Sequence, residues 1–260
     1  MPTHVVLGAT GGTGSAILRY LLSSQIPDLR INILVRSKSK LLQAFPQLES
    51  TSSASISIFE GSISNEDVVK ACLRHAETIY ICVATNHASR KVEVAVTTAA
   101  SLVAALGHLR EVDRPEYKLP VVLFNRSLSL NSDAQLPIPG FVKKFTVFAL
   151  WLIYEDLLKA GTIYEKAEKD GLLTHITADP PGLMDPERTE TTGYKFVVRG
   201  KTSATINYAD LGAALVELGQ RRKEFEGTTI GISATGPVRV DVLSNLWIIF
   251  LGLKSRLSPF

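Results

Sequence analysis

The sequence has 260 residues, of which 45% are apolar, so it can bury one large core and lies near the upper size of a single domain. The net charge of +3 is small, and the basic residues are dispersed along the chain, which argues against a nucleic-acid partner. Cys72 and Cys82 form no CxxC pair and no metal-spaced cluster. We therefore expect no metal site and a reducing compartment.

The first residues enter an apolar strand without the pattern of a secretory signal, which predicts a cytoplasmic protein. Two apolar runs, at 145–153 and 243–253, are shorter than the roughly 20 residues of a bilayer span. Helices packed on the core or over a pocket are the favoured interpretation of both runs, so no stable membrane insertion is expected. Peripheral membrane contact is the less favoured alternative.

The strongest functional signal is a strand–loop–helix unit at the start of the chain. We expect a strand at 3–7, a helix at 15–22 and a second strand at 31–35. The loop between strand and helix supplies the expected cofactor-binding residues Gly8, Thr10, Gly11, Gly12, Thr13 and Gly14.

The three spaced glycines of this loop have separate roles. Gly8 allows a sharp turn out of the strand, Gly11 lets backbone amides approach a diphosphate, and Gly14 lets the helix pack close to the sheet. The spacing is G-x-x-G-x-x-G, which differs from the standard G-x-G-x-x-G, and an ordinary turn is the alternative. The flanking strand and helix favour a dinucleotide at the helix N-terminus.

The second strand is followed by basic and hydroxyl residues, Arg36-Ser37-Lys-Ser-Lys40, at the place where the adenosine ribose should lie. An acidic residue there would bind the 2′-hydroxyl of NAD, whereas a cation pairs with the 2′-phosphate of NADP. Arg36 and Ser37 therefore predict NADPH/NADP+ as the cofactor. A solvated basic turn is the alternative.

Two further strands end where a dinucleotide would pass. The strand at 56–59 ends before Ser62, in a turn expected near the adenine. The strand at 78–83 is a nearly continuous apolar run, as in the centre of a sheet covered on both faces. After the latter come small or polar residues that would let the dinucleotide cross the strand end: Ala84, Thr85 and Asn86. His87 is a candidate acid on the substrate side, or simply a polar loop residue.

The next strands deliver candidate residues to the same edge of the sheet. The strand at 120–124 leads to Ser127, which we expect to face the nicotinamide or a substrate carbonyl, with a turn cap as the alternative. The strand at 172–177 leads to Pro180 and Pro181, which would hold the backbone rigid beside the nicotinamide.

The order of these motifs resembles a known family. The glycine loop, the Arg36 segment, Phe59-Glu-Gly-Ser62, Ser127–Asn131, Tyr154–Ala160, Pro180–Asp185 and Asn207–Leu211 occur as in the NmrA-like atypical short-chain dehydrogenase/reductases. The chain is most similar to the fungal branch of averufin oxidase-type oxidoreductases from aromatic polyketide pathways. The resemblance covers nearly the whole chain.

The resemblance implies a single extended Rossmann domain over 1–260. Its mainly parallel, doubly wound α/β sheet would have the order 3-2-1-4-5-6-7, with residues 228–232 as an edge strand. Residues 1–180 would form the nucleotide-binding core, and 183–207 with 236–260 a small substrate lobe. It also implies NADP(H)-dependent action on an anthraquinone- or xanthone-like quinone, enone or epoxide in secondary metabolism, by a monomer or homodimer.

One departure concerns the proton donor. In the main short-chain dehydrogenase branch, a lysine four residues after a tyrosine lowers the pKa of its phenol. Here the residue four positions after Tyr154 is Leu158, not a lysine. Lys159 comes five positions after Tyr154 and is therefore turned about 140° around the helix from it. Tyr154 remains a candidate catalytic residue with Ser127, but without that activation. Quinoid and enone substrates suit such a site because their developing charge is delocalised.

Two other functions remain open at this point. An NADP(H)-sensing regulator that catalyses nothing is compatible with the missing lysine, and a cyclase or isomerase could use the pocket without a redox step. The expected partner of the favoured oxidoreductase is a small aromatic molecule. Aromatic residues at 141–153 and in the last helix would favour such a ligand near the pocket mouth, with ordinary core packing as the alternative.

Overall fold

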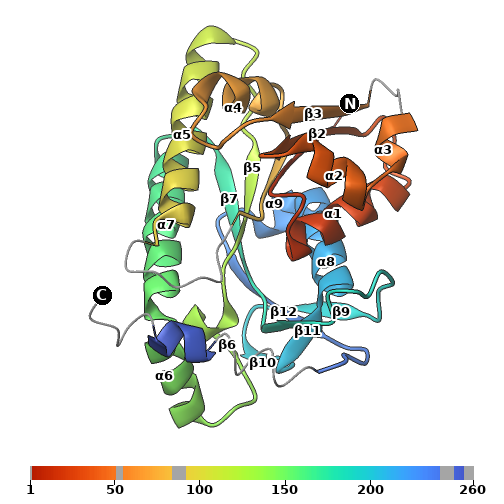
Figure 1. The fold of residues 1–260 in the computed structure, drawn as a ribbon. Helices are drawn as coiled ribbons and strands as arrows, with labels where there is room; N and C mark the ends of the chain where they lie inside the picture. The colour runs from red at the N-terminus through yellow and green to blue at the C-terminus, as the bar shows by residue number, and fades with distance from the viewer. Residues whose placement is uncertain (1, 51–54, 84–91, 241–248, 255–260) are drawn as a thin grey trace.

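The computed structural model describes residues 2–50, 55–83, 92–240 and 249–254 (Figure 1). Its centre is an eight-stranded sheet of order β3-β2-β1-β4-β5-β7-β12-β9. The strands are, in that order, β3 (Ile56–Glu60), β2 (Arg30–Val35), β1 (Thr3–Leu7), β4 (Thr78–Ile81), β5 (Val121–Asn125), β7 (Thr174–Asp179), β12 (Thr229–Ala234) and β9 (Tyr194–Val197). The first seven are parallel, which confirms the predicted doubly wound sheet and its strand order.

The predicted edge of the sheet is wrong. Residues 228–232 were expected to form an edge strand, but β9 pairs antiparallel to β12 and covers it, with Ile232 opposite Phe196. β9 is a short apolar segment inside a polar region, and β12 follows it by more than thirty residues. Local sequence therefore gives no signal that the two strands pair. The apolar residues of β9 thus belong to the main sheet.

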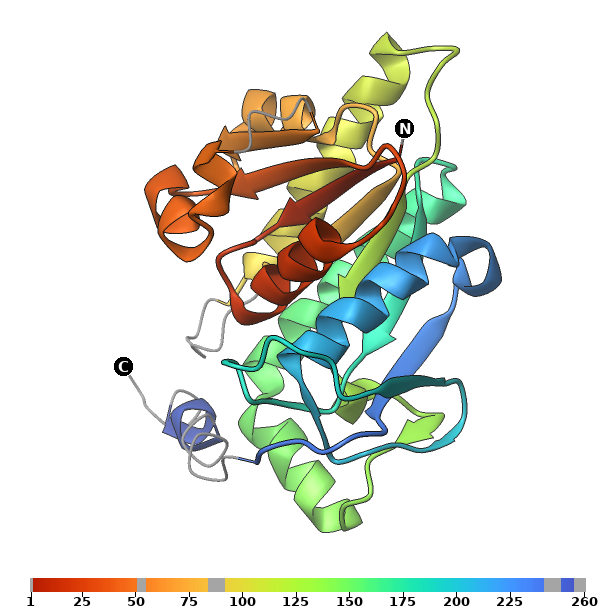
Figure 2. The same cartoon turned by 90° about the vertical axis from the view of Figure 1, so that its right-hand side faces the viewer.

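Helices cover both faces of the sheet (Figures 1 and 2). One face carries α1 (Gly12–Ser23), α2 (Lys38–Ala44), α3 (Gln47–Ser50) and α8 (Tyr208–Gln220). The other carries α4 (Glu66–Leu73), α5 (Val94–Val112) and α7 (Trp151–Lys169). Strand residues alternate between the two cores: Val5 and Leu7 pack towards α5 and α7, whereas Val6 packs towards α1 and α8.

Smaller elements gather at the carboxyl ends of β5 and β7. They include the 3₁₀ helix η1 (Leu128–Leu130), helix α6 (Gly140–Ala149), and two short parallel pairs, β6 (Ala134–Gln135) with β10 (Gly200–Lys201) and β8 (Gly182–Met184) with β11 (Thr205–Asn207). Helix α9 (Arg222–Phe225) follows α8 instead, and residues 249–254 are helical.

Candidate functional site

The glycine loop turns as the sequence predicts. Gly8 has a φ of +88°, and a Cβ at this position would stand 2.8 Å from the carbonyl oxygen of Cys82. A Cβ on Gly14 would stand 2.2 Å from the carbonyl oxygen of Gly8, so only glycine allows α1 to pack on the loop. Burial raises the pKa of Cys82 to about 12, which leaves its thiol protonated beneath this turn.

The outer side of the loop is open to a ligand. Gly11 is the N-cap of α1 and offers no side chain to the free amides, and the first turn contains no acidic residue. Thr10, Gly11 and Gly12 are exposed, whereas Thr13 is buried. Within the described chain, the nearest contact of a Cβ on Gly11 would be the Gly8 oxygen at 3.4 Å. An anion such as a diphosphate therefore fits these amides.

Sequence reasoning missed Tyr208, whose ring lies over the loop. A Cβ on Gly12 would stand 2.5 Å from Cε1 and 2.9 Å from Cζ of Tyr208. One turn further on, a Cβ on Gly212 would meet Ala16, so α1 and α8 run side by side in the same direction (Figure 2). Burial raises the pKa of Tyr208, so its hydroxyl keeps the proton and can donate to a phosphate oxygen.

The start of α8 is fixed by a buried carboxylate. The amide of Asp210 donates to Oδ1 of the N-cap Asn207, and Asp210 accepts in return from Nδ2 of Asn207. Asp210 also accepts from the Thr192 and Gly193 amides at 2.7 and 2.9 Å. This reciprocal cap explains the spacing of Asn207 and Asp210, and it holds Tyr208 in place.

The Arg36 segment lies at the carboxyl end of β2. Arg36 is exposed and has no hydrogen bond or ion pair with the residues that the structure describes. The Ser37 Oγ accepts from the Lys40 amide at 3.3 Å, and Oε1 of Glu60 accepts from the Lys38 amide at 2.9 Å. Ser37 and Glu60 thus cap α2, while the guanidinium of Arg36 is available to an anion.

The structure describes only some of the other predicted cofactor residues. Ser62 is exposed after β3, and its Oγ accepts from the Ser64 amide at 3.2 Å. Pro181 is buried just beyond β7, next to Pro180, whose carbonyl accepts from the Leu128 amide. Three cofactor candidates and one catalytic candidate lie outside the described residues: Ala84, Thr85, Asn86 and His87.

The two remaining catalytic candidates meet in space. Ser127 precedes η1, Tyr154 lies in the first turn of α7, and their hydroxyl oxygens are 3.4 Å apart. Tyr154 is buried, with 6% of its surface exposed. The Ser127 Oγ also accepts from the Ser129 amide at 3.3 Å, so the cap and the contact with Tyr154 coexist.

A buried ion pair fixes the turn that carries Ser127. Nε and an Nη of Arg126 donate to the two carboxylate oxygens of Asp179 at 2.9 and 2.7 Å, and Asn131 donates to the same carboxylate at 2.9 Å. Burial raises the pKa of Asp179, and these hydrogen bonds oppose the rise. The carboxyl ends of β5 and β7 are thereby locked together on either side of Ser127.

Asn125, at the end of β5, has an unusual environment. Its Oδ1 is buried and has no hydrogen-bond partner among the residues that the structure describes. Buried polar atoms are rarely left unpaired, and a ligand is one explanation of such an exception. The only sequence signal for it was a polar residue closing an apolar strand.

The geometry determines the class of site. A glycine loop with open amides at the N-terminus of α1, a guanidinium after β2 that is unpaired among the described residues, and a hydroxyl pair after β5 lie at the carboxyl ends of parallel strands, where doubly wound folds bind dinucleotides. Among the residues described, no cluster of His, Cys, Asp or Glu could hold a metal ion. The fold and the site together define a Rossmann-type dinucleotide-binding protein.

Comparisons with known proteins identify the family. A family described as NAD(P)H-binding matches residues 8–110. Averufin oxidase A of Aspergillus flavus is 39% identical, with 92% of this chain and 85% of that protein covered; averufin oxidase stcO of Emericella nidulans is 39% identical, with 97% and 87% covered. The chain belongs to the averufin oxidase family, which confirms the predicted resemblance and its oxidoreductase class.

A solved structure supports the fold. A short-chain dehydrogenase/reductase (wide type) from Veillonella parvula, in complex with NADP, matches with a TM-score of 0.64 at 18% identity, over 92% of this chain and 97% of that one. In the described part of this chain, no helix has the length and apolarity needed to cross a membrane.

Proposed function

We propose that this protein is an NADPH-dependent oxidoreductase that acts on an aromatic polyketide of the anthraquinone or xanthone type, at a quinone, enone or epoxide group. The observation that carries the proposal is the contact between Ser127 and Tyr154, where Ser127 follows β5 at the same edge of the sheet as the glycine loop. Two hydroxyls at this distance can both donate to one substrate oxygen. The names of the averufin oxidase relatives support the substrate class.

The choice of NADPH rests on Arg36. The amides of Gly12, Thr13 and Gly14 would hold the diphosphate, with Tyr208 beside them, and Arg36 would pair with the 2′-phosphate. When bound, the nicotinamide supplies or accepts a hydride. We assign positions 84–86 and Pro181 to the nicotinamide half of the cofactor, with Ser62 near the adenine.

Hydroxyl donors without a cation favour particular substrates. Lys159 pairs with Glu155 at 3.0 Å and is exposed, and Arg126 is neutralised by Asp179, so neither cation polarises Tyr154. A neutral pair of donors gives modest help to a developing oxyanion. Quinones and conjugated enones need little more, because the added electron pair spreads over the conjugated system.

The substrate would lie under the segments beyond the core. We assign 183–207, apart from β9, and 236–260 to this substrate lobe and His87 to its rim. A Cβ on Gly252 would stand 2.6 Å from the carbonyl oxygen of Ala149, so the helical residues 249–254 pack where α6 meets α7. Tyr154 lies one turn beyond this junction, in the first turn of α7.

The test is single-turnover oxidation of NADPH by a panel of quinones and hydroxyanthraquinones, followed by the loss of reduced-nicotinamide absorbance. Consumption with some of them, slowed in Ser127→Ala and Tyr154→Phe, is expected. NADPH binding without consumption by any compound would overturn the proposal. A regulator that senses NADP(H) is the second candidate, favoured by the unactivated Tyr154. It would discriminate strongly between NADPH and NADP+ in calorimetry and turn over neither.

A further inference from the structure

Helix α6 and the start of α7 carry large aromatic side chains that are partly exposed to solvent. Phe141, Phe145 and Phe148 are 75%, 49% and 46% exposed, and Trp151, at the start of α7, is 37% exposed. The three phenylalanines are spaced by four and three residues, so they share one side of the helix. We name these four residues the α6 aromatic face.

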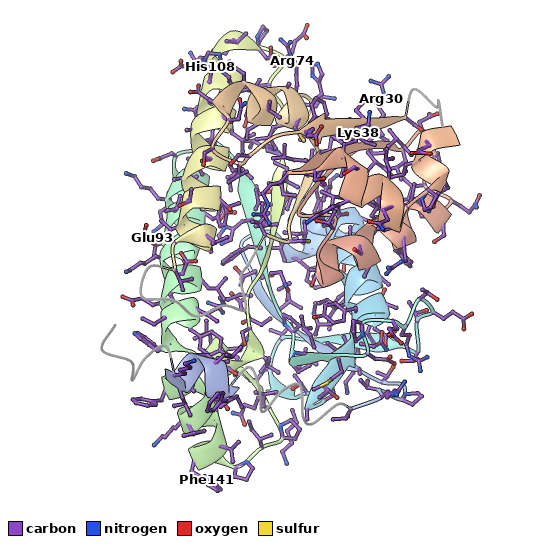
Figure 3. The ribbon with its side chains drawn as sticks, viewed as in Figure 1. Arg30, Lys38, Arg74, Glu93, His108 and Phe141 are labelled. Atoms are coloured by element: carbon purple, nitrogen blue, oxygen red, sulfur yellow. The ribbon has the colours of Figure 1, made fainter. Side chains whose placement is uncertain are left out.

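This face lies at one end of the molecule. In both ribbon views α6 is at the end opposite β3 and α4, and Phe141 points outward at its tip (Figures 1, 2 and 3). The helical residues 249–254 lie beside α6 and add Phe250, which is 53% exposed. Contiguous exposed apolar surface of this kind marks an interaction site.

The charged residues of helix α6 are basic. Between residues 136 and 154 the charged residues are Lys143 and Lys144, with no Asp or Glu. Lys143 donates to the carbonyl oxygen of Asn131 at 3.2 Å, and the exposed Lys144 forms no ion pair with the described residues. Lys254 is exposed on the neighbouring helical segment.

We propose that the α6 aromatic face docks this protein on an anionic phospholipid surface. A helix with aromatic residues on one side and lysines beside them, but too short to span, lies in the membrane interface, where the rings enter the headgroup boundary and the lysines meet anionic lipid. A symmetric dimer through the same face would instead bring the lysines of both chains together without acidic partners.

Docking has a consequence for the site. Helix α6 leads directly into α7, whose first turn contains Tyr154, and Lys143 ties α6 to the turn that carries Ser127. The surface on the bilayer would thus adjoin the Ser127–Tyr154 pair. An apolar aromatic molecule dissolved in the membrane would have a short path to that pair. The docking itself does not depend on the proposed redox function.

The test is co-sedimentation of the full chain with neutral phosphatidylcholine vesicles and with vesicles that also contain phosphatidylserine. We expect binding to the anionic vesicles that weakens in high salt, and a loss of about tenfold or more in Phe141→Ser/Phe145→Ser. Val112→Ser/Val198→Ser removes two equally exposed apolar residues elsewhere and should bind as wild type does. Lys144→Glu/Lys254→Glu should lose the anionic preference, whereas Lys223→Glu on α9 should keep it.

Three results would overturn the proposal. They are wild-type protein that stays in the supernatant with both vesicles, sedimentation that is unaffected by the paired phenylalanine changes, and a stable dimer in light scattering that those changes dissociate. The last result would assign the face to a second copy. Thermal unfolding and NADPH titration of each variant establish that a loss of vesicle binding is not a loss of fold.

Discussion

Gly14 and Gly8 pack backbone against backbone, with the site of a Gly14 Cβ only 2.2 Å from the Gly8 carbonyl oxygen. Neither backbone can move without displacing β1 or α1. We therefore expect Gly14→Ala to lower the free energy of unfolding by about 1–3 kcal/mol, measured by urea denaturation. Gly107→Ala in α5, where nothing lies within 4 Å, should instead raise it by about 0.5–1 kcal/mol. Equal effects of the two changes would contradict this account of the loop.

Arg36 should distinguish the two nicotinamide nucleotides. Arg36→Gln is expected to weaken NADPH binding about tenfold, or about 1.4 kcal/mol, and to leave NADH binding unchanged, since only NADPH has the 2′-phosphate. Isothermal titration with both nucleotides measures this. Arg30→Gln, at the opposite end of the same strand, should change neither affinity (Figure 3). A similar loss for both nucleotides would mean that Arg36 does not select the phosphate.

Removal of the hydroxyl should have different effects at two tyrosines of α7: a slower reaction at Tyr154 and a more stable fold at Tyr164. Tyr154→Phe is expected to slow hydride transfer about tenfold to a hundredfold. This is no more than the smallest rate effect typical of a general acid, because no lysine polarises this phenol. The buried hydroxyl of Tyr164 has no hydrogen-bond partner in the described part of the chain, and its ring packs on Phe124 with centroids 5.2 Å apart. Tyr164→Phe should therefore keep the rate and add about 1 kcal/mol of stability. Single-turnover rates and urea midpoints decide the matter.

His4 should make the fold sensitive to acid. It is buried, and burial lowers its pKa from 6.5 to about 4. Its Nδ1 lies 2.9 Å from the hydroxyl of Tyr80, so the neutral ring and the phenol share a hydrogen bond. The unfolded chain binds a proton more readily than the folded one, so stability from this group is full above pH 6.5. It is lost as pH falls towards about 4, by about 3 kcal/mol.

His4→Asn places an amide group near the position of Nδ1, so it keeps a hydrogen-bond partner for Tyr80 and removes the titration. The variant should lose less stability than wild type between neutral pH and pH 4, measured as free energies of unfolding across that range. Carboxylates titrate in both proteins, so the difference between the two curves isolates His4. Parallel curves would mean that the imidazole is protonated within the folded protein.

Local patterns were sufficient to predict the sheet and the loop. Parallel strands buried on both faces read as apolar runs, and Gly8, Gly11 and Gly14 stand where the turn, the open amides and the close helix packing require them. The Ser127–Tyr154 contact was also within reach, because both residues were candidate catalytic residues of the same site.

Other features depend on partners distant in the sequence. Tyr208 reaches Gly12 only because α8 packs along α1, and no spacing within either helix reveals that. Asp179 was a usable signal, since a carboxylate at the end of a buried strand needs a cation, and Arg126 was available. The pairing of β9 with β12 had no comparable sign.

The neighbourhood of α1 and α8 bears on how the protein is made. The face of the sheet that α1 begins to cover is completed by α8, about two hundred residues later in the chain. During translation, Val6, Tyr80 and Leu123 would remain bare on that side until the ribosome has released nearly all of the polypeptide. We expect a fragment that stops before Tyr208 to aggregate, and chaperones to engage the nascent chain over that interval.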